Sequence, residues 1–477
     1  MKKHPSLCLV NGAWISSSDE KTFEVTNPAT KVSLGSVPSL TSSDVTIAVN
    51  NSAKAFETWR NTPARNRSDV LISIADLLAE RLEEFASRIT SEQGKPLSEA
   101  RGEVMYAAHY FRWFSEEAVR INGDIIPADS PTKRILVLKQ PIGLVAAITP
   151  WNFPLAMLAR KVAAALAAGC SFIAKPAPET PLTALALGGL ALEAGLPSGV
   201  FNVITGDAEM IGDIFMRSPL VKTVTFTGST EVGKILIRNS AQTVKKLTLE
   251  LGGNAPFIVN EDADLEKAIE GAIYGKFRNA GQTCICINRF LIHKKVAEKF
   301  TTMLRVRMDT LVLGNGLNSD SDVGPLISEE AHAKVSRLVE MAKQTGASIV
   351  SSACAIPPGS TFFAPTIVAH VTPAMQIWHE EIFGPVCTMA TFSNDEEAIA
   401  LANDTPYGLA AYVYSKDLAR AMAMSERLEF GMVGINDTAI SSVQAPFGGI
   451  KQSGFGREGS KYGIDEYLVL KYLSVQM

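Results

Sequence analysis

The chain has few cysteines, few aromatic residues and no marked excess of charge of either sign. Its 477 residues include 6 cysteines, aromatic residues make up 7%, and the formal net charge is -4 at pH 7. Cysteines this sparse exclude a disulfide scaffold and indicate a reducing compartment, so we expect a cytoplasmic protein in which any special cysteine is catalytic. The balanced charge argues against nucleic acid or an anionic membrane as the main partner, and it leaves small anionic substrates open.

Long apolar runs are also missing. The run 7–10 near the N-terminus is too short for the core of a secretory signal. The most apolar stretch, residues 153–168, is shorter than a bilayer span and has Arg160 and Lys161 in its middle. We interpret this stretch as a buried helix, and we expect no membrane partner.

Two motifs of other enzyme classes are absent. The chain has no G-x-x-x-x-G-K-[ST] phosphate loop and no H-E-x-x-H zinc helix. No set of Cys and His residues has the paired spacing of a structural zinc site, so we expect no bound metal.

Strand and helix signals alternate between residues 143 and 253. This order is typical of an α/β protein with an open parallel sheet covered by helices, a doubly wound layout that binds nucleotides. The G-x-G-x-x-G fingerprint is missing from the first turn of this sheet, which counts against the commonest dinucleotide-binding variety. The predicted strands are 145–149, 172–175, 200–204, 223–227 and 246–251, and the predicted helices are 155–168, 181–194, 210–216 and 230–239.

A second α/β series follows Gly252-Gly253, which we interpret as a domain boundary. A chain of 477 residues is too long for one core, so two or three domains are expected. Residues 124–140 and 459–477 fit neither series, and they are either extended arms that pair with another subunit or surface hairpins. The second series has predicted strands near 257–259, 290–293, 386–391 and 433–436, and predicted helices near 265–277, 298–311 and 396–403.

Cys284 lies in the segment Gly281-Gln282-Thr283-Cys284, shortly after a predicted helix. Because Gly281 ends that helix, the thiol lies on an irregular connection where it can be exposed. A nucleophilic thiol needs such access together with a lowered pKa. The alternative is a buried, inert cysteine.

Glu250, Asn152 and Ser229 each stand where a predicted strand ends or a predicted helix starts. The carboxylate of Glu250 can deprotonate water if burial keeps its pKa near the working pH, and the alternative is an exposed charge at a strand end. The amide of Asn152 either caps the helix that follows Pro154 or donates to an oxyanion. The N–H groups after Gly228-Ser229 either hold a pyrophosphate or are capped locally.

Arg160 and Arg278 lie in largely apolar helices, and Arg278 is six positions before Cys284. Arginine is rarely buried without a partner, so two such residues near a thiol indicate a bound carboxylate. Arginine holds a carboxylate through paired donors better than lysine does. The alternative is that each arginine pairs with an acidic side chain of the protein.

Together these motifs resemble the aldehyde dehydrogenase family, and the resemblance covers nearly the whole chain. Each motif alone is modest, but their joint occurrence in this order is very specific. They are Asn11-Gly12, Asn27-Pro28-Ala29-Thr30, Pro150-Trp151-Asn152-Phe153-Pro154, Lys175-Pro176, Phe226-Thr227-Gly228-Ser229, Glu250-Leu251-Gly252-Gly253, Gly281-Gln282-Thr283-Cys284, Glu380-Glu381-Ile382-Phe383-Gly384-Pro385, Pro446-Phe447-Gly448-Gly449 and Lys451-Gln452-Ser453-Gly454.

The resemblance implies an NAD(P)-dependent aldehyde dehydrogenase with the fold of that family: two doubly wound α/β domains and a small β oligomerisation arm. The implied cofactor-binding domain is 1–123 with 141–251, and the implied catalytic domain is 252–450. Residues 124–140 and 451–477 are then the arm and tail of a homodimer or homotetramer.

The resemblance also implies roles for individual residues. Cys284 corresponds to the nucleophile and Glu250 to the general base, and Asn152 forms the oxyanion hole with the backbone N–H of Cys284. The aldehyde is then oxidised through a thiohemiacetal and a thioester on Cys284. The positions that correspond to cofactor-binding residues are Trp151, Lys175, Pro176, Ala177, Pro178, Gly228, Ser229, Leu251, Glu381 and Phe383.

Within the family, residues 440–443 and 456–467 are similar to succinate-semialdehyde dehydrogenases. The implied reaction is the oxidation of succinate semialdehyde to succinate, with Arg160, Arg278 and Ser441 contacting the substrate. Glutarate semialdehyde or another aldehyde is the alternative, because one methylene changes specificity only about 10–200-fold. A non-catalytic binding or structural protein is a remote alternative, since the nucleophile and the base are both present.

NADP is the expected cofactor, with NAD as the alternative. Many NAD-preferring relatives carry an acid at the position of Pro178, which would repel a 2′-phosphate, whereas Lys175 can attract one. Glu179 opposes this interpretation, because a shift of one residue would bring its carboxylate to the ribose.

Cys286 is separated from Cys284 by a single residue. If the loop is not helical, the two thiols can approach, and oxidation would lock Cys284 in a strained, easily reduced disulfide. Some relatives of the succinate-semialdehyde group carry the same pair. The alternative is that Cys286 packs beneath the loop as a small apolar residue.

Overall fold

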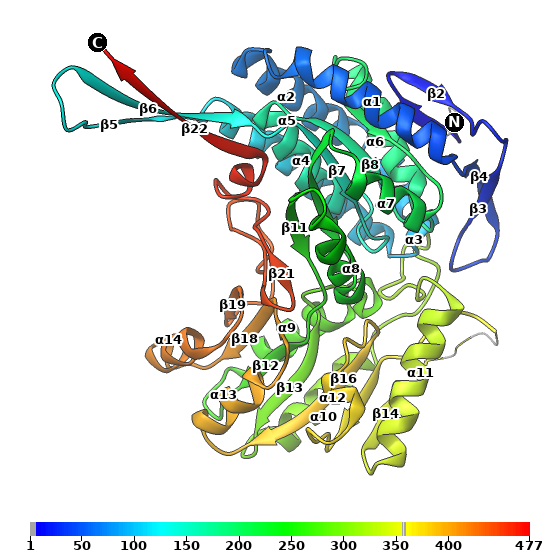
Figure 1. Cartoon of the computed structure of the whole chain (residues 1–477). Helices are drawn as coiled ribbons and strands as arrows, with labels where there is room; N and C mark the ends of the chain where they lie inside the picture. The colour runs from blue at the N-terminus through cyan, green and yellow to red at the C-terminus, as the bar shows by residue number, and fades with distance from the viewer. Residues whose placement is uncertain (1–5, 355, 357–358) are drawn as a thin grey trace.

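The computed structural model describes residues 6–354, 356 and 359–477 (Figure 1). Its first large sheet has eight strands in the order β2-β1-β9-β8-β7-β10-β11-β21. The five strands from β9 to β11 in this order run parallel, and β1, β2 and β21 join them by antiparallel pairing. The doubly wound sheet predicted for residues 143–253 is therefore confirmed. The strands are β1 (Cys8–Val10), β2 (Ala13–Ile15), β7 (Leu144–Ile148), β8 (Ser171–Lys175), β9 (Phe201–Val203), β10 (Val221–Thr227), β11 (Lys246–Glu250) and β21 (Gly454–Phe455).

Helices cover both faces of this sheet. Successive residues of the central strand β7 point to opposite faces, and those on either face are buried. Val145 and Ala147 belong to a buried cluster with residues of α2, α4, α5 and α6, whereas Leu144 and Ala146 belong to a second cluster with residues of α1 and α7. No helix of the described residues is long and apolar enough to cross a membrane. The helices are α1 (Ser42–Trp59), α2 (Ala64–Glu80), α3 (Leu82–Gln93), α4 (Leu97–Ala118), α5 (Ala156–Ala168), α6 (Pro181–Glu193), α7 (Ala208–Arg217) and α8 (Thr230–Ser240).

The helix α5 is the apolar stretch that the sequence placed in the interior. All of its residues are buried, including Arg160 and Lys161, and it ends where Gly169 turns to a φ of 94°. A left-handed glycine is a common end of a helix, because the absence of a Cβ removes the steric cost of that conformation.

The second sheet has the order β14-β15-β16-β13-β12-β18-β19, and only β14 at its edge is antiparallel to its neighbour. Residues 251–254 connect the end of β11 to the start of β12, so the carboxyl edge of the first sheet meets the amino edge of the second. The elements are β12 (Ala255–Val259), β13 (Ile287–His293), β14 (Ser348–Ser351), β15 (Thr366–Ala369), β16 (Val386–Phe392), β18 (Ala410–Tyr414), β19 (Met432–Ile435), α9 (Leu265–Phe277), η1 (Arg278–Gly281), α10 (Ala297–Met308), α11 (Glu329–Gln344), α12 (Gln376–His379), α13 (Asp395–Asn403) and α14 (Leu418–Arg427).

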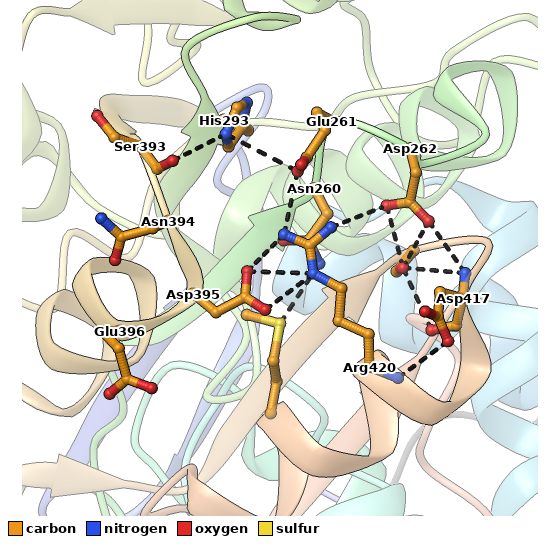
Figure 2. Close-up of polar contacts among 12 residues, drawn as sticks. Asn260, Glu261, Asp262, His293, Ser393, Asn394, Asp395, Glu396, Asp417 and Arg420 are labelled. Carbon is orange, nitrogen blue, oxygen red and sulfur yellow. Dashed lines mark hydrogen bonds and ion pairs between the residues drawn. The ribbon is translucent and has the colours of Figure 1, made fainter.

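A cluster around Arg420 ties together the loops at the opposite, carboxyl edge of the second sheet (Figure 2). Its guanidinium on α14 donates to Glu261 at 3.0 Å and to Asp395 at 2.9 Å, and Asp262 lies 3.5 Å away. Glu261 and Asp262 follow β12 and Asp395 begins α13, so one cation on α14 holds these two segments together. This edge lies far along the strands from Cys284, which precedes β13.

A three-stranded antiparallel sheet projects from the body of the molecule and carries the C-terminus (Figure 1). We call it the arm; its strands are β5 (Asp124–Ile126), β6 (Lys133–Pro141) and β22 (Leu468–Gln476). Of the tail that follows residue 450, only β22 belongs to the arm. The other elements are β3 (Thr22–Thr26) paired with β4 (Ser33–Pro38), β17 (Tyr407–Gly408) paired with β20 (Ile450–Lys451), and η2 (Gly463–Tyr467).

Candidate active site

Two cavities lie where the two large sheets meet, and Cys284 lines both of them. The first has a volume of about 430 Å³ and is lined by residues of α4, α5 and α9. The second has a volume of about 300 Å³ and lies at the ends of β10 and β11. We call them the substrate cavity and the cofactor cavity. A thiol between two cavities can face a different molecule on each side.

The chain reaches Cys284 through a strained left-handed turn. Asn279, Ala280 and Gly281 have φ values of 52°, 54° and 77°. This conformation costs about 1–2 kcal/mol for a residue with a Cβ. At Gly281 a Cβ would lie 2.2 Å from the carbonyl oxygen of Gly384, so only glycine fits. Such strain persists where the surroundings hold it, and it is common at functional sites.

Asn279 and Asn152 hold the two loops of the site together. The amide nitrogen of Asn279 donates to the carbonyl oxygens of Asn152 at 2.9 Å and of Gln282 at 3.2 Å. The amide nitrogen of Asn152 donates to the same Gln282 oxygen at 2.9 Å, which leaves its second hydrogen available. No described residue accepts a hydrogen bond from the N–H of Cys284, so this donor is available to an oxyanion as well.

The helix-cap interpretation of Asn152 is wrong. The helix α5 has no side-chain cap from the residues just before it. Instead, Oε1 of Glu103 accepts the N–H groups of Leu155 at 2.9 Å and Ala156 at 3.1 Å. A carboxylate from α4 therefore satisfies the donors that Asn152 would otherwise cap.

The thiol of Cys284 does not have the lowered pKa expected of a nucleophile. Burial raises its pKa to about 12, Arg160 and Arg278 lower it, and Glu381 and Glu250 raise it further. Loss of hydration outweighs the two cations, because the charged thiolate is the form that burial disfavours.

Glu250 ends β11 as a buried carboxyl, so the alternative of an exposed charge is wrong. Its residue is 3% exposed, and neither carboxyl oxygen has a hydrogen bond to the described residues. Burial raises its pKa well above the usual range, the neighbouring Glu458 raises it further, and Lys161 lowers it. Its Oε1 lies beside Gly448, off the lining of both cavities. A buried carboxyl with a raised pKa is suited to proton transfer.

The residues of the cofactor cavity fit a dinucleotide. Ser229 caps α8 locally by accepting the N–H of Val232 at 3.3 Å, as the alternative interpretation has it. Gly228 and Ser229 nevertheless line the cavity, and a pyrophosphate at this helix start stays a prediction. The carboxyl of Glu381 accepts the N–H of Gly253 at 2.9 Å, and burial raises its pKa to about 7. Of the predicted cofactor positions, Trp151, Gly228, Ser229, Leu251, Glu381 and Phe383 line this cavity.

Lys175, Pro176, Ala177 and Pro178 do not line it; Lys175 ends β8 and the other three follow that strand, at the same edge of the sheet. Lys175 is 4% exposed; burial lowers its pKa, and the nearby carboxylate of Glu179 raises it. Lys175, which would attract a 2′-phosphate, therefore lies close enough to Glu179, which would repel one, for the two charges to interact.

Arg160 lies on the inner wall of the substrate cavity and is held by protein groups. It donates to the hydroxyls of Tyr106 at 2.8 Å and Ser441 at 2.9 Å, and its Nη1 lies 3.5 Å from Oε2 of Glu458. The alternative to a bound carboxylate is that each arginine pairs with an acidic side chain of the protein. For Arg160 that alternative is confirmed, because it pairs with Glu458. The same carboxylate of Glu458 also pairs with Lys161.

Arg278 lines the same cavity without an acidic partner. None of the described residues forms an ion pair with it, and its one hydrogen bond is donated to the hydroxyl of Tyr274 at 3.1 Å. Its Cζ lies 5.2 Å from the centre of the Tyr274 ring and 5.3 Å from that of Phe153. Two aromatic rings therefore hold this arginine, which forms no ion pair with a described residue but lowers the pKa of Glu99 on the wall of the same cavity.

Cys286 begins the approach to β13 and is buried. Its thiol lies 3.7 Å from the carbonyl oxygen of Lys276 and 3.6 Å from that of Ile287. All six cysteines are free in this structure. This reduced form has the packing of the alternative interpretation, and a disulfide with Cys284 stays a prediction.

Sequence reasoning missed several residues around the site. Lys161 could have been found by the same signal as Arg160, because it too is a charged residue inside an apolar stretch. Glu458 lies within residues 456–467, the segment that is similar to succinate-semialdehyde dehydrogenases. Glu103, which supports the loop of Asn152, and Tyr274 carry no such signal. Within the described residues, no group of three or more His, Cys, Asp or Glu is arranged to hold a metal ion.

Known proteins are similar to this chain over nearly its full length. Residues 14–473 match the aldehyde dehydrogenase family. A succinate semialdehyde dehydrogenase of Acinetobacter baylyi is 51% identical over 464 residues, which cover 97% of this chain and 96% of that protein. A glutarate-semialdehyde dehydrogenase of Pseudomonas aeruginosa is 49% identical over 464 residues, with the same coverage of 97% and 96%. The crystal structure of an NADP dependent enzyme of E. coli has a TM-score of 0.98 and 48% identity, and covers 100% of this chain and 99% of that chain.

Fold, cavities and similarity together define an oxidoreductase: the chain belongs to the aldehyde dehydrogenase family. More particularly, it is an NAD(P)-dependent aldehyde dehydrogenase, as its sequence predicted. The alternative of a non-catalytic protein is therefore set aside.

Proposed function

We propose that this enzyme oxidises succinate semialdehyde to succinate. The observation that carries the proposal is Arg278, whose guanidinium lines the cavity of Cys284 and forms no ion pair with the described residues. A guanidinium that is held beside a cavity without an ion-pair partner favours a ligand with a carboxylate. Arg160 and Ser441 line the same cavity, so a second cation and a hydroxyl face the substrate.

The proposed chemistry begins at Cys284. The thiolate attacks the aldehyde carbon, and Arg160 and Arg278 favour that thiolate by lowering the thiol pKa against burial. The oxyanion accepts hydrogen bonds from the Asn152 amide and the Cys284 N–H. Removing one such donor typically lowers the rate about 10²–10³-fold.

The second half of the proposed chemistry releases the acid. A nicotinamide cofactor, when bound in the cofactor cavity, supplies the acceptor for the hydride of the thiohemiacetal. Cys284 then carries a thioester, and Glu250 takes a proton from the water that hydrolyses it. A covalent intermediate divides a difficult oxidation into two easier steps.

For the cofactor we propose NADP, with NAD as the alternative. Pro178 places no acid at its position, and Lys175 stands at the end of the adjoining strand β8. Glu179 favours the alternative, because its carboxyl is close enough to Lys175 to change the pKa of that lysine. The ratio of kcat/KM values for the two cofactors decides between them.

We propose further that the arm joins subunits in a homodimer or homotetramer. Ile125, Leu470 and Tyr472 of its strands are 78%, 70% and 57% exposed, an apolar surface that a second copy would cover. In this arrangement 1–123 and 141–251 bind the cofactor, 252–450 is the catalytic domain, and 124–140 with 451–477 form the arm and tail. The six free cysteines fit a cytoplasmic enzyme.

Glutarate semialdehyde is the second candidate substrate, favoured by the 49% identical relative that carries that name. The test of the main proposal compares kcat/KM for succinate semialdehyde with that for butanal, which has the same length and no carboxylate. We expect succinate semialdehyde to be favoured about 100-fold or more. A ratio near one overturns the proposal, and a larger value for glutarate semialdehyde replaces it by the second candidate.

A further inference from the structure

Tyr274 lies on the wall of the substrate cavity and takes no part in the chemistry described above. It belongs to α9 and stands one helical turn before Arg278, so the two side chains lie on the same face. Its hydroxyl accepts the hydrogen bond from Nη1 of Arg278 at 3.1 Å, and the residue is 44% exposed. The tyrosine is therefore both a partner of the arginine and part of the outer wall.

The two arginines of this cavity are held very differently. Arg160 is 3% exposed and has three polar partners, which are Tyr106, Ser441 and Glu458. Arg278 has a single hydrogen bond among the described residues. The position of the Arg278 guanidinium relative to Cys284 therefore depends mainly on Tyr274. The position of Arg160 is shared among three partners, and no single one of them determines it.

We propose that Tyr274 determines which carboxylate-bearing aldehydes this enzyme prefers, by fixing Arg278 at one distance from Cys284 and by filling the cavity beyond it. This inference rests on the proposed function, since it requires Arg278 to receive the carboxylate. The phenol hydroxyl occupies one N–H of the guanidinium, and the remaining donors stay free for a ligand. When Arg278 cannot shift outward, its distance from Cys284 is fixed. It then favours the semialdehyde whose aldehyde carbon and carboxylate are separated by that distance, which we propose is succinate semialdehyde rather than the longer glutarate semialdehyde.

Two substitutions separate the two parts of this role. Tyr274→Phe keeps the ring and its volume but removes the hydrogen bond that fixes the guanidinium. Tyr274→Ala removes both, so that Arg278 can move outward and the cavity lengthens by most of a side chain. Because Tyr274 is half-exposed, we expect both variants to fold.

The experiment measures kcat/KM for succinate semialdehyde, glutarate semialdehyde and butanal in the parent and in both variants. For Tyr274→Phe we expect kcat/KM to fall about 10-fold for the two semialdehydes, through KM rather than kcat. For Tyr274→Ala we expect the ratio of glutarate over succinate semialdehyde to rise about 10-fold or more. Butanal, which has no carboxylate, keeps its parental kcat/KM. Tyr462→Phe, which alters a tyrosine that is 52% exposed and outside this cavity, is the matched control.

The outcomes distinguish this inference from the proposed function. If the parent favours succinate semialdehyde over butanal but both variants keep the parental ratios, the role of Tyr274 is overturned and the proposed function stands. An equal loss for all three aldehydes also overturns it, because that pattern reports a general defect. If the parent itself does not distinguish the semialdehydes from butanal, the proposed function fails first.

Discussion

Nζ of Lys95 donates a buried hydrogen bond of 2.8 Å to the backbone carbonyl oxygen of Asn152. The lysine is also paired with Glu103 at 2.6 Å, with side-chain exposures of 0% and 1%. Burial lowers the pKa of Lys95, and the Glu103 carboxylate raises it. Because Glu103 in turn holds the start of α5, this ion pair fixes the loop that presents the Asn152 amide.

We predict that Lys95→Met lowers both stability and kcat. The substitution leaves the carboxylate of Glu103 buried without its cation, which typically costs about 3–5 kcal/mol. The loop of Asn152 is then free to shift, and a displacement of about 1 Å can cost on the order of 10²-fold in rate. Urea unfolding and steady-state kinetics measure the two effects, with the exposed Lys54→Met as control. A variant with parental kcat contradicts the positioning role.

The raised thiol pKa predicts how Cys284 reacts with an alkylating reagent. Only the thiolate reacts, and burial raises the pKa of the thiol to about 12. We therefore expect the rate of carbamidomethylation by iodoacetamide to rise about tenfold per pH unit throughout the range in which the fold persists. Arg278→Met removes a cation that lowers this pKa and slows the reaction at every pH. Cys284→Ser supplies the background, and a plateau near neutral pH contradicts the raised pKa of the thiol.

Glu250→Gln separates the two halves of the proposed chemistry. The amide cannot take a proton from water, so hydrolysis of the thioester slows by about 10²–10⁴-fold. Formation of the thioester does not require that proton transfer, and we expect a burst of one reduced cofactor per active site. Stopped-flow absorbance measures the burst, and mass spectrometry of the quenched enzyme detects the acyl group on Cys284. Parental turnover, or the absence of a burst, excludes Glu250 from this role.

The proposed disulfide between Cys284 and Cys286 predicts reversible inactivation by peroxide. Cys286 must turn away from the carbonyl oxygens of Lys276 and Ile287 to reach its neighbour. In the parent, dithiothreitol should then restore activity, because so strained a ring is easily reduced. In Cys286→Ala the nucleophile oxidises beyond the disulfide stage and the loss is irreversible. Identical recovery of the two proteins shows that Cys286 only packs beneath the loop.

The sequence predicted the elements between residues 143 and 253 well, because short apolar runs and helical periodicity alternate there. The predicted strand 246–251 is β11 (Lys246–Glu250), and the predicted helix 265–277 of the second series is α9 itself. The four helices before residue 120 were not predicted. Helix α4 buries Glu103, Ser115 and Glu117, and polar side chains on the inner face blur its periodicity. Strands of two or three residues, such as β1 and β21, are too short to show any period.

The site could be predicted only as far as its residues stand in recognisable segments. Cys284, Asn152 and Glu250 stand at or just after the ends of strands and helices. The structure places Asn152 and Cys284 on one cavity, and Glu250 is close enough to raise the pKa of Cys284. Lys95 and Glu103 were missed because a charged residue is ordinarily expected at the surface. Their burial depends on a pairing across eight positions and on contact with a loop more than fifty residues away, which no local pattern reveals.

We propose above all that Arg278 selects an aldehyde by its carboxylate. The most direct measurement is the ratio of kcat/KM for succinate semialdehyde over butanal, in the parent and in Arg278→Met side by side. We predict that the parental ratio falls about 30-fold or more in the variant, because the partner of the substrate carboxylate is removed, whereas the loss of a cation that lowers the Cys284 pKa slows both aldehydes equally and cancels in the ratio. The same ratio in both proteins would contradict the claim.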